Sequence, residues 1–178
     1  MKKTILLMVL IVAILSISSC GPSRINPMEL KAERETANSR FENLLDKLES
    51  KDIEEVKSLF AESAKQTEDF DKWLSMLINY YKGESYNYDD HGTGPSTSKT
   101  IKSGRKRIEY VKSYDVYTTE EVYRIFLVDI VHNDFSDEEV GIKSLYIIKY
   151  KNDTAQKYIY RGDGKETPGI HIAKTEEN

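Results

Sequence analysis

The sequence contains very little cysteine and histidine. Cys20 is the only cysteine among 178 residues, and the three histidines are scattered along the chain. A single cysteine excludes an intramolecular disulfide bond and offers no set of thiolates for a structural zinc site or a redox motif. The histidines support no Ser/His/Asp arrangement. We therefore expect a fold that is held together by its hydrophobic core.

The chain also lacks an excess of positive charge. Its formal net charge is −4 at pH 7, and it becomes −6 if residues 1–19 are removed, because Lys2 and Lys3 are the only charged residues there. An acidic domain disfavours nucleic acid and anionic lipid surfaces as main partners. The sequence shows no internal repeat, and its length is that of one ordinary domain.

Only one long hydrophobic run is present, at residues 5–17. It follows two lysines and precedes Ser18, Ser19 and Cys20. This layout predicts a secretory signal peptide over residues 1–19, which is too short and wrongly flanked for a membrane-spanning helix. The apolar-small-small-Cys ending resembles the lipobox of bacterial lipoproteins. The resemblance implies that Cys20 is diacylated and becomes the first residue of the mature protein.

The predicted anchor defines the organisation of the rest of the chain. Two acyl chains hold a protein stably at a membrane, since each buried methylene contributes ~0.8 kcal/mol. We expect a short tether at residues 20–27, one domain at residues 28–173 and a polar tail at residues 174–178, on the extracytoplasmic face of the cell membrane. The alternative is an ordinary signal peptide cleaved nearby, which leaves Cys20 as a free thiol.

The first half of the chain has helical periodicity. Asn26, Pro27 and Glu29 are typical of a helix start, with a cap, a first-turn proline and a capping-box carboxylate. Ser50 is predicted to cap a second, shorter helix, and Thr67 to open a third that ends before Gly83. The apolar stripes of the three helices are Ala37, Phe41, Leu44, Leu45 and Leu48; Ile53, Val56, Leu59 and Phe60; and Phe70, Trp73, Leu74, Leu77, Ile78 and Tyr81.

The second half has strand periodicity. Alternation over residues 86–88 and 108–116 predicts half-buried strands, while residues 122–131 are apolar on both faces and predict a central strand. Residues 90–98 read as a polar loop and 133–139 as a turn. Ile142, Tyr146, Ile148 and Tyr150 share one parity, and residues 158–160 and 170–172 predict two closing strands. Together these patterns predict an α+β fold, with three N-terminal helices packed on one face of an antiparallel sheet.

Residues 41–60, FENLLDKLESKDIEEVKSLF, resemble the opening of the nuclear transport factor 2-like superfamily, in which a long helix continues into a short helix that ends in Leu-Phe. The order of elements is similar over residues 28–172. Residues 160–171, YRGDGKETPGIH, are similar to the ending of an uncharacterised family of Gram-positive bacterial lipoproteins with this fold. The resemblance implies a cone in which helices cover a curved sheet. It implies no single function, because the superfamily includes enzymes, carriers and interaction modules.

Enzymes of this superfamily place a carboxylate in the cone as a general base, as ketosteroid isomerases do. Asp129 is the candidate here, because it interrupts the apolar central strand. Its parity groups it with Tyr123, Ile125 and Leu127, whereas Arg124 and His132 lie on the opposite face. No second carboxylate or base lies at a sequence spacing that would indicate an acid/base pair with Asp129. A paired or hydrogen-bonded supporting role for Asp129 is therefore the favoured interpretation, and catalysis is the alternative.

The sequence predicts no metal site and no cofactor. Asp89-Asp90-His91 and the acidic turn at residues 134–139 lack the spacing of a ligand set. The twelve tyrosines are a better indication, because a ring with a polar tip suits pocket walls and interfaces, although cross-strand packing explains such rings equally well. The candidate ligand-binding residues are Trp73, Tyr81, Tyr110, Tyr123, Asp129 and Tyr146.

These observations favour a membrane-anchored, non-enzymatic binding module. Its partner would be a small molecule in the cone or a protein on the Tyr-rich sheet face, with an immunity-type protein that neutralises a toxin as one version. A homodimer through the sheet is a further candidate assembly. The alternative is an isomerase- or hydrolase-like enzyme that uses Asp129. A filled cone together with an exposed aromatic sheet face would favour protein binding. A rigid, partly polar cavity that contains Asp129, with a proton-transfer partner within reach, would favour the enzyme.

The anchor can be tested at Cys20. Cys20→Ala should leave the protein as an uncleaved precursor or release it from the membrane fraction, because the acylated thiol is gone. Metabolic labelling with a fatty-acid analogue checks this directly. Equal labelling of the wild type and the variant would contradict a lipid anchor at this residue.

Overall fold

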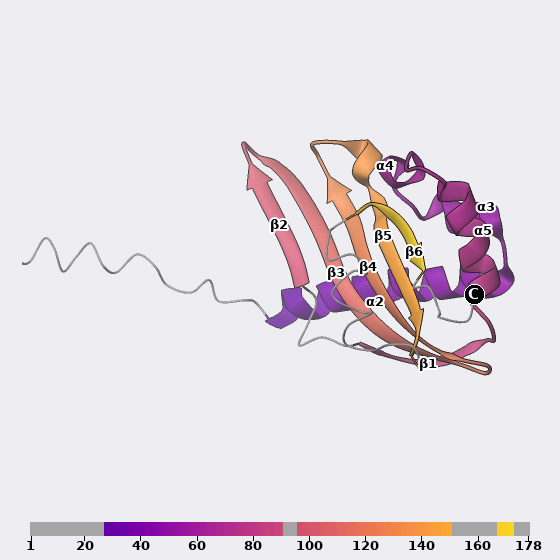
Figure 1. Ribbon diagram of the computed structural model, residues 1–178. Coiled ribbons are helices and arrows are strands. Elements are labelled where there is room, and N and C mark those ends of the chain that lie inside the picture. The colour runs from indigo at the N-terminus through magenta and orange to yellow at the C-terminus, as the bar shows by residue number, and fades with distance from the viewer. Residues whose placement is uncertain (1–26, 91–95, 151–166, 173–178) are drawn as a thin grey trace, which may run out of the picture.

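A computed structural model describes residues 27–90, 96–150 and 167–172. One long helix, α2 (Pro27–Ser50), crosses a six-stranded sheet, and three short helices gather at one end of it (Figure 1). These are α3 (Ile53–Ser58), α4 (Glu62–Lys65) and α5 (Phe70–Tyr80). Within these ranges no helix combines the length and apolarity that crossing a membrane requires. The fold is α+β, as predicted.

The sheet has the order β1-β3-β4-β5-β6, and β2 pairs with β3 beyond the end of β1. The hairpin of β3 and β4 forms its centre and contains the predicted central strand. A short 3₁₀ helix, η1 (Asp137–Glu139), lies in the predicted turn between β4 and β5. The strands are β1 (Ser85–Asp90), β2 (Ser96–Lys102), β3 (Arg105–Thr118), β4 (Val122–Asn133), β5 (Gly141–Lys149) and β6 (Gly169–Ile172).

Two predictions about the sheet were wrong. The sheet is mixed rather than antiparallel, because β6 runs parallel to β5, with His171 opposite Tyr146. A parallel neighbour needs a long connection, and the chain between β5 and β6 provides one. Strand β2 was predicted as part of a polar loop. It lies at the edge of the sheet, and its one large apolar side chain, Ile101, is 71% exposed, so no alternation marks it.

The helix count was also wrong, since the described residues form four α-helices rather than three. Helix α4 is a single turn, too short to show a periodic pattern, and Thr67 closes it by donating its hydroxyl to the Ala64 carbonyl at 2.7 Å. Helix α5 therefore starts later, at Phe70. Asp52, not Ser50, caps α3, accepting the Glu55 amide at 3.1 Å, and Ile53 is 41% exposed rather than inward-facing.

The core lies between α2, α5 and the inner face of the sheet. Phe41 of α2 stacks on Tyr114 of β3 with ring centroids 3.7 Å apart and the planes 6° from parallel. The predicted stripe of α2 is buried along its whole length. Burying one large apolar side chain contributes about 1.5–3 kcal/mol, so this seam supplies much of the stability. The sheet contributes Tyr114, Val116, Tyr123, Ile125, Leu127, Ile142, Leu145, Ile147 and Ile170.

A bulge in β5 reverses part of the predicted strand pattern. Val128 pairs with Ser144 and Asp129 with Ile142, so Lys143 is an extra residue in β5. Ile142 consequently packs in the main core, whereas Tyr146 packs on the other face of the sheet. The predicted shared parity of Ile142 and Tyr146 was therefore wrong.

The chain between α3 and α4 approaches β5 closely. The Ile142 amide donates to the Leu59 carbonyl at 2.9 Å, and the Ala61 amide donates to the Ile142 carbonyl at 3.0 Å. Gly141 makes this approach feasible, because its φ is +122° and a Cβ there would lie 2.7 Å from the Ala61 nitrogen. The short helices are thus attached to the sheet through backbone hydrogen bonds as well as through side chains.

The seam between α2 and the sheet should dominate stability. Leu48→Ala removes a side chain with no exposed surface and should lower the free energy of unfolding by about 2–5 kcal/mol, out of about 5–15 kcal/mol for a typical domain. Ile101→Ala, on the exposed edge strand, should change it by less than about 0.5 kcal/mol. Urea unfolding of both variants measures the difference. Similar losses in the two variants would refute this assignment of the core.

Candidate functional site

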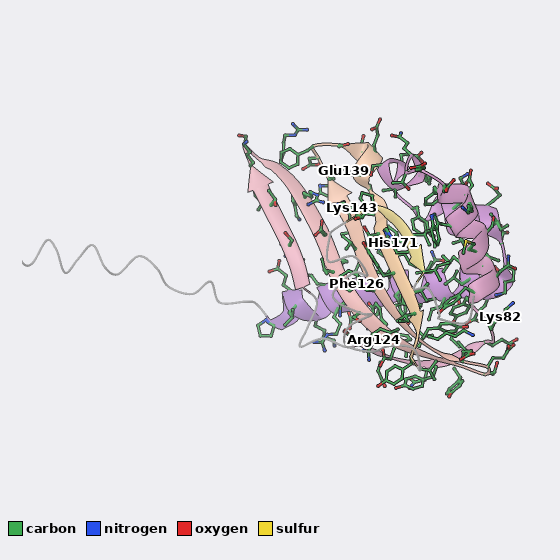
Figure 2. All side chains as sticks on the ribbon, viewed as in Figure 1. Lys82, Arg124, Phe126, Glu139, Lys143 and His171 are labelled. Carbon is green, nitrogen blue, oxygen red and sulfur yellow. The ribbon has the colours of Figure 1, made fainter. Side chains whose placement is uncertain are left out.

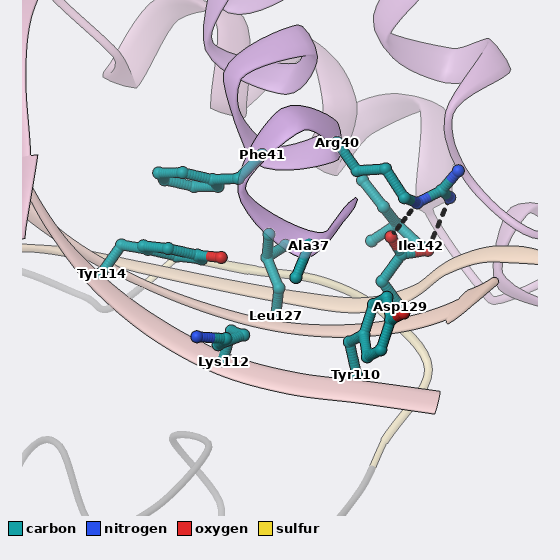
Figure 3. Close-up of a pocket in the computed structure, with 9 residues that line it drawn as sticks. All are labelled: Ala37, Arg40, Phe41, Tyr110, Lys112, Tyr114, Leu127, Asp129 and Ile142. Atoms are coloured by element: carbon teal, nitrogen blue, oxygen red, sulfur yellow. Dashed lines mark hydrogen bonds and ion pairs between the residues drawn. The ribbon is translucent and has the colours of Figure 1, made fainter. Parts of the chain in front are cut away.

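Asp129 lies on the inner face of β4 and is bonded to Arg40 of α2 (Figure 3). The Arg40 Nε atom donates to Oδ2 at 2.5 Å, and Nη2 donates to Oδ1 at 2.8 Å. Asp129 is 7% exposed, so a nearly desolvated carboxylate has its charge balanced by a two-point guanidinium contact. The hydrogen bond to Asp129 raises the pKa of Arg40. Asp129 is therefore paired, and the supporting role that the sequence favoured for it stays a prediction.

A second buried ion pair lies beside the first one. Lys112 of β3 is 4% exposed, and its ammonium group donates to Asp90 Oδ2 of β1. The other oxygen, Asp90 Oδ1, is buried and has no hydrogen-bond partner among the residues that the structure describes. The sequence predicted that Asp90 begins a polar loop. For Asp90 this prediction was wrong, because Asp90 is the last residue of β1 and the counter-ion of a buried lysine.

The two ion pairs leave little free space inside the fold. The cavity between them has a volume of about 10 Å³, which is room for roughly one water molecule. Pockets that bind small molecules measure about 300–1,000 Å³. At this place the described side chains leave no room for a small molecule. The cavity is lined by Ala37, Arg40, Phe41, Tyr110, Lys112, Tyr114, Leu127, Asp129 and Ile142.

Of the six predicted ligand-binding residues, only Tyr110 and Asp129 line this cavity. Tyr81 and Tyr123 stack on each other elsewhere in the core with centroids 5.1 Å apart. Burial raises the pKa of Tyr123 to about 12, and its hydroxyl donates to the Tyr80 carbonyl at 2.9 Å. Trp73 is half-buried on α5 and packs against the core. These three aromatic residues serve packing.

Tyr146, the sixth predicted residue, lies on the face of the sheet opposite the main core. It stacks on His171 with centroids 4.2 Å apart and meets Phe126 edge-on at 6.1 Å. Figure 2 shows Phe126 and His171 on the side of the sheet away from α2. Phe126 is 6% exposed and Tyr146 is 3% exposed, so this aromatic cluster is buried. The predicted exposed Tyr-rich face is therefore not found at β4 and β5.

Among the described residues, no group of three or more His, Cys, Asp or Glu side chains could hold a metal ion. In the acidic turn, Asp134 instead accepts the Lys106 amide at 2.8 Å and contacts His132 at 3.0 Å. The backbone hydrogen bond from Lys106 lowers the pKa of Asp134. His91 and Cys20 lie outside the described ranges.

A larger hollow lies on the surface, between the C-terminal half of α2 and strand β1. We call it the α2–β1 groove; its volume is about 250 Å³. The Tyr88 hydroxyl donates to Glu42 Oε1 across it at 2.6 Å, and Tyr86 is 71% exposed. Burial and the nearby Glu42 raise the pKa of Tyr88 to about 12. The groove is lined by Glu42, Leu45, Asp46, Ser85, Tyr86, Asn87 and Tyr88.

Sequence reasoning missed Arg40 and Lys112, although both carried a signal. Arg40 lies three residues after Ala37 and four before Leu44, at the border of the apolar stripe of α2, and its side chain is 41% exposed. Lys112 alternates with Tyr110 and Tyr114 on the inner face of β3. A charged residue at an inward position predicts a buried partner.

Comparison with sequence families adds one match. A family described as a domain of unknown function (DUF5104) matches residues 43–150. The matched residues run from the second half of α2 to the end of β5 and include Lys112 and Asp129. A comparison with curated proteins gives no match.

The Arg40–Asp129 pair can be tested by a double-mutant cycle. Arg40→Met should lower the free energy of unfolding by about 1–3 kcal/mol at neutral pH, because it leaves a desolvated carboxylate without a partner. Arg40→Met combined with Asp129→Leu should recover most of that loss, since no charge remains unpaired. Lys31→Met removes one partner of an exposed pair on the same helix and should change stability by less than about 0.5 kcal/mol. Strictly additive losses in urea unfolding would disprove the coupling.

Proposed function

Because this chain belongs to the DUF5104 family, whose description assigns no activity, we propose its function from the site: it is a non-enzymatic binding module, lipid-anchored at Cys20 on the extracytoplasmic face of a membrane. The observation that carries the proposal is the small space left around Asp129. The cavity there, about 10 Å³, accommodates no substrate, and residues of two ion pairs line it. Binding then takes place on the outside of the domain.

We also propose that the fold is a cone of the nuclear transport factor 2-like type. The support is the placement of one long helix across a sheet that bends around it, with the helices preceding the strands (Figure 1). In such a cone the enzyme site would lie between α2 and the sheet. In this chain Arg40, Phe41 and Lys112 occupy that volume.

The enzyme alternative needs a carboxylate that can accept a proton from a substrate. A general base must reach the proton it abstracts to within hydrogen-bond distance. Both oxygens of Asp129 are already bonded to Arg40, and the adjacent lysine is bonded to Asp90. This pairing, together with the lack of space, supports binding rather than catalysis.

The predicted anchor suits recognition of a protein at the membrane surface. Six residues separate Cys20 from Pro27, and the seven steps between these two residues span at most about 25 Å when extended. Helix α2 then adds about 36 Å at 1.5 Å per residue. The domain would stay close to the membrane and still present its far end to the outside. A protein that neutralises a toxin arriving at the membrane would have such a placement.

Affinity purification of the full-length protein from its native membranes tests the proposal. Asp129→Asn should keep co-purifying proteins within about tenfold of the wild-type amount, because one interior group contributes at most about 1.4 kcal/mol to surface binding. Quantitative mass spectrometry of proteins and small molecules provides the readout. A small molecule that the wild type converts and the Asn variant does not would refute the binding module and favour the enzyme.

A further inference from the structure

We infer that the α2–β1 groove is the binding surface, and that it takes an extended, positively charged protein segment that adds a strand to β1. The inference rests on the proposed binding function and names its partner by chemistry. Four observations support it: the unneutralised carboxylates of the groove, the edge of β1 that pairs with no other described strand, an exposed tyrosine and the charge that a second copy would bring.

The carboxylates of the groove are not neutralised by Lys47 of α2 or by Lys51, which follows the helix. Glu42 and Asp46 line the groove one helical turn apart, and both are exposed. Lys47 pairs instead with Glu55 of α3 at 3.0 Å. Lys51 donates to the Ile78 carbonyl at 3.0 Å and to the Tyr81 carbonyl. The groove therefore has a negative charge that a cationic partner would balance.

Strand β1 borders the groove with the edge that pairs with no other described strand. It stands at the end of the sheet order and pairs with β3 on one side. Successive residues of a strand point to opposite faces of the sheet. Four consecutive residues, 85–88, nevertheless line the groove, so the groove runs along the backbone edge of β1 and not along one face. The Ser85 amide at one end donates to Glu49 Oε1 at 2.8 Å. An extended peptide could pair with the remaining backbone groups.

Tyr86 adds an aromatic surface at the mouth of the groove. Its side chain is 71% exposed at the irregularity in β1 pairing between Ser85 and Asn87. A tyrosine face beside two carboxylates suits arginine, which stacks on the ring and bonds to a carboxylate in two places. The Tyr88 hydroxyl bonded to Glu42 holds one of these carboxylates at the groove wall.

A second copy of the chain would be a poor occupant. Two copies joined through their β1 edges would place the exposed Asp89, Glu42 and Asp46 of each near those of the other. Like charges at an interface oppose association, and the whole chain is acidic. Opposite charge therefore selects a basic segment of another protein.

Peptide binding to the full-length protein in detergent tests the inference. The probe is a fluorescein-labelled octapeptide of alternating arginine and valine, followed by fluorescence anisotropy at physiological salt. Glu42→Gln with Asp46→Asn should weaken binding at least about tenfold. The matched control is Glu54→Gln with Glu68→Gln, which removes the same charge from exposed helix and loop positions and should stay within about twofold of the wild type.

The same peptide with N-methyl groups on every second residue separates strand addition from charge attraction. It keeps the arginines but cannot pair as a strand, so its binding should weaken at least about tenfold. Equal weakening by the groove and control variants, unchanged binding of the N-methyl peptide, or no binding of the parent peptide would each overturn the inference. A dimer in sedimentation that the groove variant abolishes would overturn it in favour of a second copy.

Purification from native membranes distinguishes a failure of the groove inference from a failure of the proposed binding function. Partners that the groove variant retains in full would place binding elsewhere and leave the binding module intact. Partners lost from the groove variant and kept by the control variant would support the inference. A substrate turned over by the wild type would contradict the binding module itself, whatever the peptide does.

Discussion

The structure depends on how α2 lies against the sheet. Its apolar stripe sets the depth of packing, but such a stripe alone allows the helix to roll. The two hydrogen bonds from Arg40 to Asp129 form in only one orientation of the guanidinium plane. The stacking of Phe41 on Tyr114 requires one orientation of the Phe41 ring, and both orientations are met at the same rotation of α2. Together they fix the rotation of α2. The same rotation that closes the interior turns Glu42 outward along β1.

Much of this fold could be predicted from the sequence, because periodic patterns govern its longest elements. The stripe of α2 and the central strand followed from apolar spacing alone. The one-turn helix α4, the edge strand β2 and the parallel strand β6 did not, since short or exposed elements carry little pattern. The bulge at Lys143 shifted a parity that no local signal marked. Of the site, Asp129 was found and Arg40 was not, since charged residues on a helix are usually solvated.

Charged side chains lie between α2 and the sheet of this domain, at positions where apolar side chains are usual. Two ion pairs connect α2 to β4 and β1 to β3, elements that are far apart in sequence. Buried pairs add little net stability, because desolvation offsets their attraction, but each tolerates only one arrangement of its partners. The tyrosines differ in the same way in how far they are buried. Most of the described tyrosines pack inside the core or on the other face of the sheet, whereas Tyr86 lies at the surface beside acidic groups.

The β3–β4 hairpin has a consequence for the order of folding. Strands of 14 and 12 residues meet across a turn of residues 119–121, so their pairing closes a short loop and can form early. Arg40 and Asp129 are 89 positions apart, and their contact closes a far longer one. We therefore expect Asp129 to stay hydrated on the early hairpin until α2 packs on it. In that order, water leaves the carboxylate only when the guanidinium replaces it, and no intermediate with a dry, unpaired charge forms.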